Sequence, residues 1–179
     1  MSRFFEVTEP IFSITHSEAA FNSTVVFPSL KAVFQHFYEQ YRTKCYPSEE
    51  KLEALFTQLK KIDARSGYNA DSIIRVGVHN NIELMIAEVS SCFSKPNKSK
   101  HATDHYKGMF SLLSMCKGIA DNYKHASLET FKKQKVFFVR AYNQHVYLNR
   151  SGEVLDFMYF VNEIKVEIKE ALSNLDILE

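Results

Sequence analysis

The spacing of hydrophobic residues predicts a chain made mainly of helices. Apolar residues recur every three or four positions in several stretches, which is the repeat of a helix that buries one face. The predicted helices cover residues 28–43, 48 to just before Gly67, 70–93, 104–125 and 156–175. Gly77 weakens the third of these by up to about 1 kcal/mol relative to alanine, so that helix could break there.

Other stretches have the β-branched and aromatic composition of strands. Residues 2–27 resemble extended structure, and residues 135–155 contain two or three short strands followed by a Ser151-Gly152 turn. Residues 94–103 are polar, contain Pro96 and are typical of a linker. The predicted fold is therefore mainly α, a bundle of about five helices with a small β-hairpin element near 135–155. The chain forms one domain in this prediction, divided into 1–27, 28–93, 94–103 and 104–179.

Composition places the chain among globular proteins. It has 179 residues, of which 45% are hydrophobic and 24% charged, enough for one domain with its own core and too apolar for disorder. The net charge of +1 gives no overall attraction to nucleic acid or to anionic lipid. No apolar run approaches the length of a membrane span, and the three cysteines are widely spaced. We expect a cytoplasmic protein with no membrane partner and no cofactor.

Positive charge is concentrated in one part of the sequence. Residues 95–135 contain nine lysines and three acidic residues, a net charge of +6. Such a run usually forms a solvated helix face. The alternative is a surface that binds an anionic partner.

Two histidines have the spacing of metal ligands. His101 and His105 are four residues apart and would share one face of a helix. The sequence lacks an HExxH motif, and no third ligand is fixed by spacing. We therefore expect no metal site and interpret both as solvated histidines near a helix start.

The stretch from Cys116 to Leu128 contains the strongest candidate for chemistry. Lys117, Asp121 and His125 follow one another in steps of four, and Asn122 lies one turn before His125. An imidazole, an amide and an ammonium group on one polar face could bind and polarise a phosphodiester. The alternative is an ordinary helix end, where cations such as Lys124 and His125 favour the helix dipole.

The same stretch carries a family resemblance. The sequence IADNYKHASL at residues 119–128, followed by strands, an SGEVLD turn and a closing helix, is similar to a bacterial group with an IAN-x-x-KH-x-x-L signature. That group resembles the HEPN (higher-eukaryote and prokaryote nucleotide-binding) helical superfamily, and the resemblance covers about residues 104–175. It implies an α-helical bundle, often dimeric, of a kind that includes many RNases of toxin–antitoxin and antiphage systems.

The resemblance implies roles for four residues. His125 would act as acid and base, Asn122 would orient the substrate, and Lys117 or Lys124 would bind phosphate. HEPN RNases have an arginine four to six residues before the histidine, whereas the nearby cations here are lysines, which lack the planar fork of arginine.

The sequence leaves three functions open. One is a HEPN-like defence or toxin–antitoxin protein that acts on or binds RNA or a nucleotide, with or without catalysis. Another is a non-catalytic interaction subunit of a larger complex. The third, ranked last, is a metal-dependent enzyme that uses His101 and His105. Aromatic residues clustered on two predicted helices favour a homo-oligomer or a protein partner. One cluster is Phe34, Phe37, Tyr38 and Tyr41, and the other is Phe157, Tyr159 and Phe160.

Overall fold

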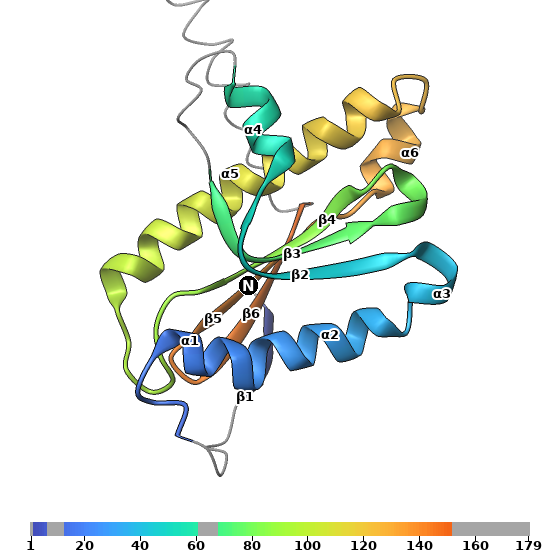
Figure 1. Cartoon of the computed structure of the whole chain (residues 1–179). Coiled ribbons are helices and arrows are strands. Elements are labelled where there is room, and N and C mark those ends of the chain that lie inside the picture. Colours follow the sequence, from blue (N-terminus) through green and yellow to red (C-terminus); the bar gives the residue numbers. More distant parts are fainter. Residues whose placement is uncertain (1, 7–12, 61–67, 152–179) are drawn as a thin grey trace, which may run out of the picture.

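The chain has an α/β fold, so the prediction of a mainly α bundle is wrong. The computed structural model describes residues 2–6, 13–60 and 68–151, and these form a mixed sheet of six strands with helices on both faces (Figure 1). The strand order is β1-β6-β5-β4-β3-β2. The strands are β1 (Ser2–Glu6), β2 (Thr43–Lys51), β3 (Asn69–Val76), β4 (Ile82–Val89), β5 (Phe137–Tyr142) and β6 (His145–Arg150).

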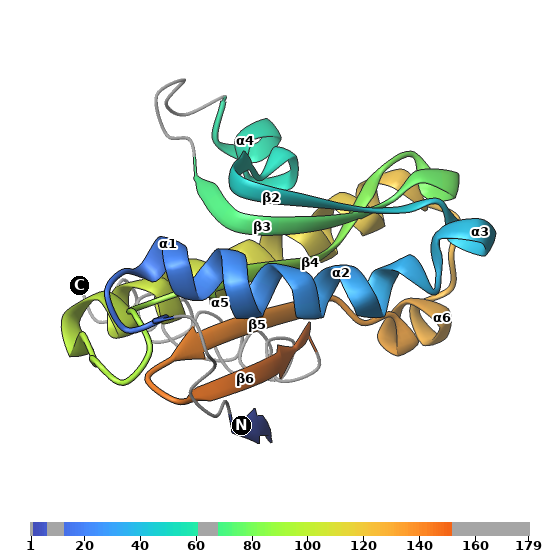
Figure 2. The same cartoon turned by 60° about the horizontal axis from the view of Figure 1, so that its bottom comes forward.

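Strands β4 and β5 are parallel, and the other neighbouring strands of this sheet are antiparallel. The parallel pair is joined by the long helix α5 (Lys98–Asn122), which covers one face of the sheet. Helix α1 (Glu18–Phe21), the π-helical turn η1 (Asn22–Val26) and α2 (Phe27–Gln35) cover the opposite face (Figure 2). The sheet therefore lies between two helical layers.

Each face of the sheet has its own hydrophobic core. The core under α1 and α2 includes Phe21, Leu30, Phe34, Ile74 and Val89. The core under α5 includes Ile73, Ile86, Leu112, Met115 and Phe138. Gly108 of α5 lies so close to the ring of Phe138 that a Cβ there would lie 2.1 Å from the nearest ring atom. This glycine lets the first half of α5 approach the sheet.

The predicted helix over 70–93 is wrong, because this stretch forms the β3–β4 hairpin. A 3-10 turn, η2 (Gly77–His79), follows β3, and Asn80 and Asn81 then have φ of 55° and 56°. Asparagine tolerates this left-handed region better than most residues. Both faces of the sheet are covered, so consecutive residues at the end of β3 are all buried. Without an alternation of apolar and polar residues, the apolar positions resemble the spacing of a helix.

Other predicted boundaries are also wrong. The predicted helix over 28–43 is replaced by most of α2, the short α3 (Tyr38–Tyr41) and the start of β2. The predicted helix that starts at residue 48 is replaced by the end of β2 and by α4 (Glu53–Leu59). The N-terminal segment is extended in β1 but helical from Glu18. The predicted linker 94–103 contains the start of α5, whose first turn is capped by the Asn97 side chain.

The strands predicted within 135–155 are confirmed as β5 and β6, which follow the short helix α6 (Leu128–Lys133). The predicted closing helix at 156–175 lies outside the described residues. Within the described part of the chain, no helix is both long enough and apolar enough to cross a membrane.

Candidate functional site

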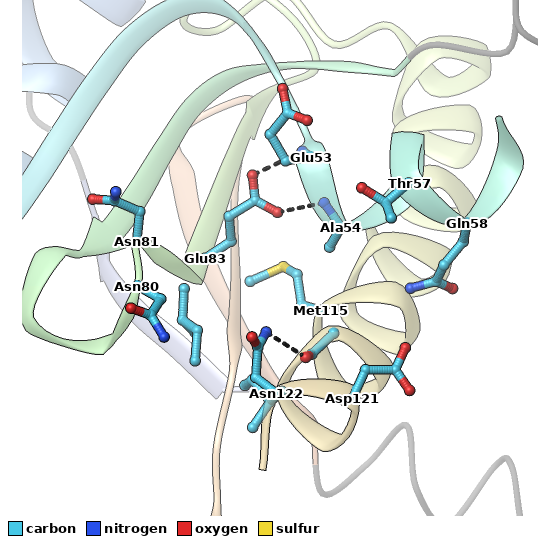
Figure 3. Close-up of a pocket in the computed structure, with 13 residues that line it drawn as sticks. Glu53, Ala54, Thr57, Gln58, Asn80, Asn81, Glu83, Met115, Asp121 and Asn122 are labelled. Atoms are coloured by element: carbon cyan, nitrogen blue, oxygen red, sulfur yellow. Dashed lines mark hydrogen bonds between the residues drawn. The ribbon is translucent and has the colours of Figure 1, made fainter. Parts of the chain in front are cut away.

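Asn122 lines a small polar pocket between α4 and the end of α5 (Figure 3). The pocket has a volume of about 240 Å³. The Asn122 amide donates a hydrogen bond to the Gly118 carbonyl of its own helix, with a distance of 2.9 Å. The Glu83 carboxylate accepts hydrogen bonds from the backbone N–H groups of Glu53 and Ala54 at the start of α4. These polar groups stabilise the chain itself, and no histidine is found among the described residues lining the pocket.

The other three residues predicted with Asn122 lie on exposed surface outside this pocket. Lys117 forms an exposed ion pair with Asp121, with a distance of 2.5 Å. Helix α5 ends at Asn122, so Lys124 and His125 lie in the turn that leads to α6. His125 is therefore not on the helical face that the sequence predicted it to share with Lys117.

His101 and His105 lie in the first half of α5. The Nδ1 atom of each is buried and has no hydrogen-bond partner among the described residues. The His101 ring packs against the Tyr142 ring, with 3.8 Å between centroids. Burial and the nearby charge of Arg140 lower the pKa of both histidines, so both favour the neutral form.

Three polar side chains lie in a row across three neighbouring strands on the face that α5 covers, and Asp71 of β3 lies beside them. Arg140 of β5 pairs with Glu88 of β4 on one side and with Tyr147 of β6 on the other. The Asp71 carboxylate accepts a hydrogen bond of 2.7 Å from the backbone N–H of Val89 and also interacts with the Asn22 side chain of η1. The next row along these strands is apolar and belongs to the core under α5: Ile73, Ile86 and Phe138.

The polar row lies where α/β proteins usually bind ligands. Glu88 is the last residue but one of β4, and Arg140 is near the end of β5. These are the carboxyl ends of the parallel pair, and the crossover helix α5 begins beside them. Ligands of α/β sheets bind outside the carboxyl ends of strands, where helix N-termini also favour negative charge.

Glu88 is buried beside a tyrosine and another carboxylate. The Tyr68 hydroxyl donates a hydrogen bond to the Glu88 carboxylate. Burial, followed by the charge of Asp71, raises the pKa of Glu88 to about 8. Burial and the Glu88 charge also raise the pKa of Tyr68. At neutral pH, Glu88 therefore holds a proton that a bound cation would displace.

Asp71 shares this environment. Burial raises its pKa, although the hydrogen bond from Val89 and the charge of Lys100 act in the opposite direction. The Lys100 ammonium donates hydrogen bonds to the Val89 carbonyl, at 3.0 Å, and to Glu18. Burial lowers the pKa of Lys100, but the bond to Glu18 and the surrounding carboxylates more than offset that effect, so Lys100 stays charged.

A third carboxylate faces the same layer from α5. Asp104 is only 3% exposed, and its Oδ2 atom has no hydrogen-bond partner among the described residues. Its charge contributes to the raised pKa values of Glu88, Asp71 and Tyr68, which places it near all three. A buried carboxylate oxygen without a donor is costly unless a ligand satisfies it.

The arrangement suits a divalent cation that is coordinated partly by the protein and partly by a bound substrate. Among the described residues, no three His, Cys, Asp or Glu side chains form a group that could enclose a metal ion. Mg²⁺ does not need such a group, because it is commonly bound by one or two carboxylates, by water and by substrate phosphates. Asp71 and Glu88 could provide the two carboxylates, and Lys100 provides a positive charge beside them.

No known family model matches this sequence, and comparisons with curated proteins and with solved structures give no match either. The HEPN resemblance thus gains no support from known proteins, and the helical bundle it implies is not the observed fold.

Sequence patterning missed Asp71 and Glu88 because both fell in the predicted helix over 70–93. The signal that could have found them is the Asn80-Asn81 pair between two runs rich in isoleucine and valine, which is typical of a hairpin. In a hairpin centred there, Asp71 and Glu88 come to opposed positions on paired strands, as the Ser72–Ala87 pairing beside them requires.

Proposed function

We propose that this chain is a divalent-cation-dependent phosphodiesterase with Asp71, Glu88 and Lys100 at its centre. The observation that carries the proposal is the buried carboxylate of Glu88 and the half-buried carboxylate of Asp71 on adjacent strands, with an ammonium group beside them, at the carboxyl end of a parallel strand pair. The proposal keeps the nucleic-acid or nucleotide substrate expected from the sequence, but it moves the site away from His125.

The electrostatics of the pair favour a cation. Burial raises the pKa of both carboxylates, and the charge of Asp71 raises that of Glu88 further. A divalent cation bound by these carboxylates would offset the cost of their charges and displace the Glu88 proton. Strongly perturbed carboxylates beside a specific charge partner are typical of functional sites.

Lys100 favours an anionic ligand at the same place. Its ammonium is held by the Val89 carbonyl and Glu18, so it is a fixed positive charge near the carboxylates. Asp71 and Glu88 would hold the cation, which would act as a Lewis acid and lower the pKa of a coordinated water. In the reaction, water attacks phosphorus, the bond from phosphorus to the leaving oxygen breaks, and the leaving oxygen takes up a proton. The products are a phosphomonoester and an alcohol, and Lys100 stabilises the charge on the phosphoryl oxygens.

Mg²⁺ and Mn²⁺ titrations followed by calorimetry test the cation site. Asp71→Asn and Glu88→Gln should each weaken cation affinity at least tenfold. Glu129→Gln is the matched control, since it removes an exposed carboxylate on α6. Cleavage of labelled single-stranded and duplex oligonucleotides is then measured with Mg²⁺ and with EDTA. We expect cleavage in Mg²⁺ alone, with losses in Asp71→Asn and in Lys100→Met.

The same assay distinguishes the new centre from the predicted His125 face. His125→Ala should leave cation-dependent cleavage unchanged. Cleavage that persists in EDTA and disappears in His125→Ala would instead support catalysis by the face predicted from the sequence. Absence of cation binding at millimolar concentrations in the parent protein would overturn the proposed function.

A further inference from the structure

Two aromatic side chains on the outer side of α5 lie largely in solvent. Tyr106 is 67% exposed and Phe110 is 63% exposed, the two largest values among the large hydrophobic side chains in the described residues. They are four residues apart, so they are neighbours on one face of the helix. Phe110 has no polar atom to offset this exposure, and adjacent exposed rings of this kind commonly mark a binding surface.

A groove extends from Phe110 to Tyr68, the residue whose hydroxyl contacts Glu88. The groove has a volume of about 770 Å³ and runs between α4 and α5. Phe110, Lys107 and Tyr68 are among the residues that line it. The Lys107 ammonium lies 5.7 Å from the centroid of the Tyr68 ring, and the Tyr68 hydroxyl contacts Glu88. A ligand that covers Phe110 in this groove would thus reach the ring that contacts the proposed catalytic carboxylate.

The chain segment that carries these rings is basic, which favours a polyanion over a protein partner. Lys107 lies between the two rings in sequence, within the stretch 95–135 whose net charge is +6. Lysine is depleted in the cores of protein–protein interfaces. Exposed rings beside a lysine are, in contrast, typical of surfaces that bind single strands, where bases stack on the rings and cations contact phosphates.

We propose that the substrate is a single-stranded nucleic acid whose bases stack on Tyr106 and Phe110 while its backbone passes Lys107 towards Glu88. This inference rests on the proposed function for the chemistry at Glu88, but the stacking surface is defined independently. Duplex bases are already stacked on one another and offer no free faces to these rings. The site should therefore discriminate strongly between single strands and duplexes.

Fluorescence anisotropy with a labelled 12-nucleotide oligo-dT and a hairpin duplex of the same length tests the inference. Binding is measured in EDTA, so that neither the cation site nor cleavage affects the result. The Tyr106→Ala/Phe110→Ala variant should lose at least tenfold in affinity for the single strand, the loss expected when a base no longer stacks on a ring. Tyr38→Ala, which removes an exposed ring on α3, is the control. Tyr106→Phe, which keeps a ring at that position, should bind like the parent.

The outcomes separate this inference from the proposed function. Single-strand affinity within twofold of the parent in the double variant, or an equal loss for the duplex, would overturn the stacking surface even if Asp71→Asn abolishes cleavage. Loss of single-strand affinity without any cation-dependent cleavage would support the surface and reject the proposed centre. A change from dimer to monomer in the double variant, with oligonucleotide affinity unchanged, would assign the rings to a contact between two copies and overturn the inference.

Discussion

The Tyr68 hydroxyl donates its hydrogen bond to Glu88, a carboxylate that is itself protonated at neutral pH because its pKa is raised to about 8. Tyr68 lies directly before β3 and lines the groove along α5, and Glu88 lies on β4 in the buried polar row. This pair makes the candidate site sensitive to pH, with consequences for both stability and ligand binding.

The first prediction concerns stability and pH. Glu88 has an ordinary pKa of 4.5 when unfolded and about 8 when folded, so between these values only the folded state keeps the proton. The free energy of unfolding should therefore decrease as pH rises from 4.5 to 8, by up to about 1.4 kcal/mol per pH unit from this group. Glu88→Gln should flatten the dependence. Urea unfolding of both proteins across this range measures the difference, and parallel profiles would contradict the assignment.

The second prediction concerns cation binding and pH. A cation at Asp71 and Glu88 must displace the Glu88 proton, so its affinity should rise with pH until about pH 8. The increase in melting temperature caused by 10 mM Mg²⁺ should be larger at pH 8.5 than at pH 6. Differential scanning fluorimetry of the parent and Asp71→Asn gives the comparison. An increase of equal size at both pH values would indicate a cation bound elsewhere.

The fold itself was only partly predictable from sequence. The strands at β5 and β6 were recognised because aromatic and β-branched residues there lack helical spacing. The β3–β4 hairpin was missed for a physical reason, since a strand buried on both faces has no alternation between polar and apolar residues. Helix α5 was recognised, but its first turns were assigned to a linker because Lys98 and Lys100 are polar.

The candidate site was even less predictable from the sequence than the fold. Asp71 and Glu88 are 17 positions apart, and only strand pairing brings them together. Lys100 appeared in the sequence as a linker residue, and its contact with the Val89 carbonyl depends on how α5 crosses the sheet. Motif spacing along one helix, which selected His125, cannot detect a site built from neighbouring strands and a crossover helix.

The third prediction tests the ion pair beside the pocket of Figure 3. Arg75 contacts both Glu83, at 3.0 Å, and Glu50, at 2.5 Å, and the Arg75 and Glu83 side chains are nearly buried. Glu83→Gln would leave the guanidinium with less compensation and weaken the cap of α4, so we expect a loss of about 3 kcal/mol. Glu129→Gln, in the exposed pair with Lys132, should change stability by less than about 0.5 kcal/mol. Chemical denaturation measures both, and equal effects would contradict a structural role for Glu83.

The fourth prediction uses two glycines of the same helix as a matched pair. A Cβ at Gly108 would lie 2.1 Å from the Phe138 ring, which is fully buried and cannot move aside without disturbing the core under α5. Gly108→Ala should therefore destabilise the protein by about 1–3 kcal/mol, the usual range for overpacking. A Cβ at Gly118 would lie 3.6 Å from the Ala54 Cβ, an ordinary contact, so Gly118→Ala should gain up to about 1 kcal/mol from helix propensity.

If α5 packs on the sheet as described, thermal and urea unfolding should show that Gly108→Ala lowers the stability of the protein and that Gly118→Ala raises it. The Gly108→Ala/Phe138→Leu double variant adds a test of the mechanism, because a smaller side chain opposite the new methyl group should recover part of the lost stability. Equal stabilisation by both single substitutions would mean that the first half of α5 does not approach Phe138. Asp104 and Lys100 occupy that same half of α5. That result would therefore also remove their placement beside Asp71 and Glu88, on which the proposed centre depends.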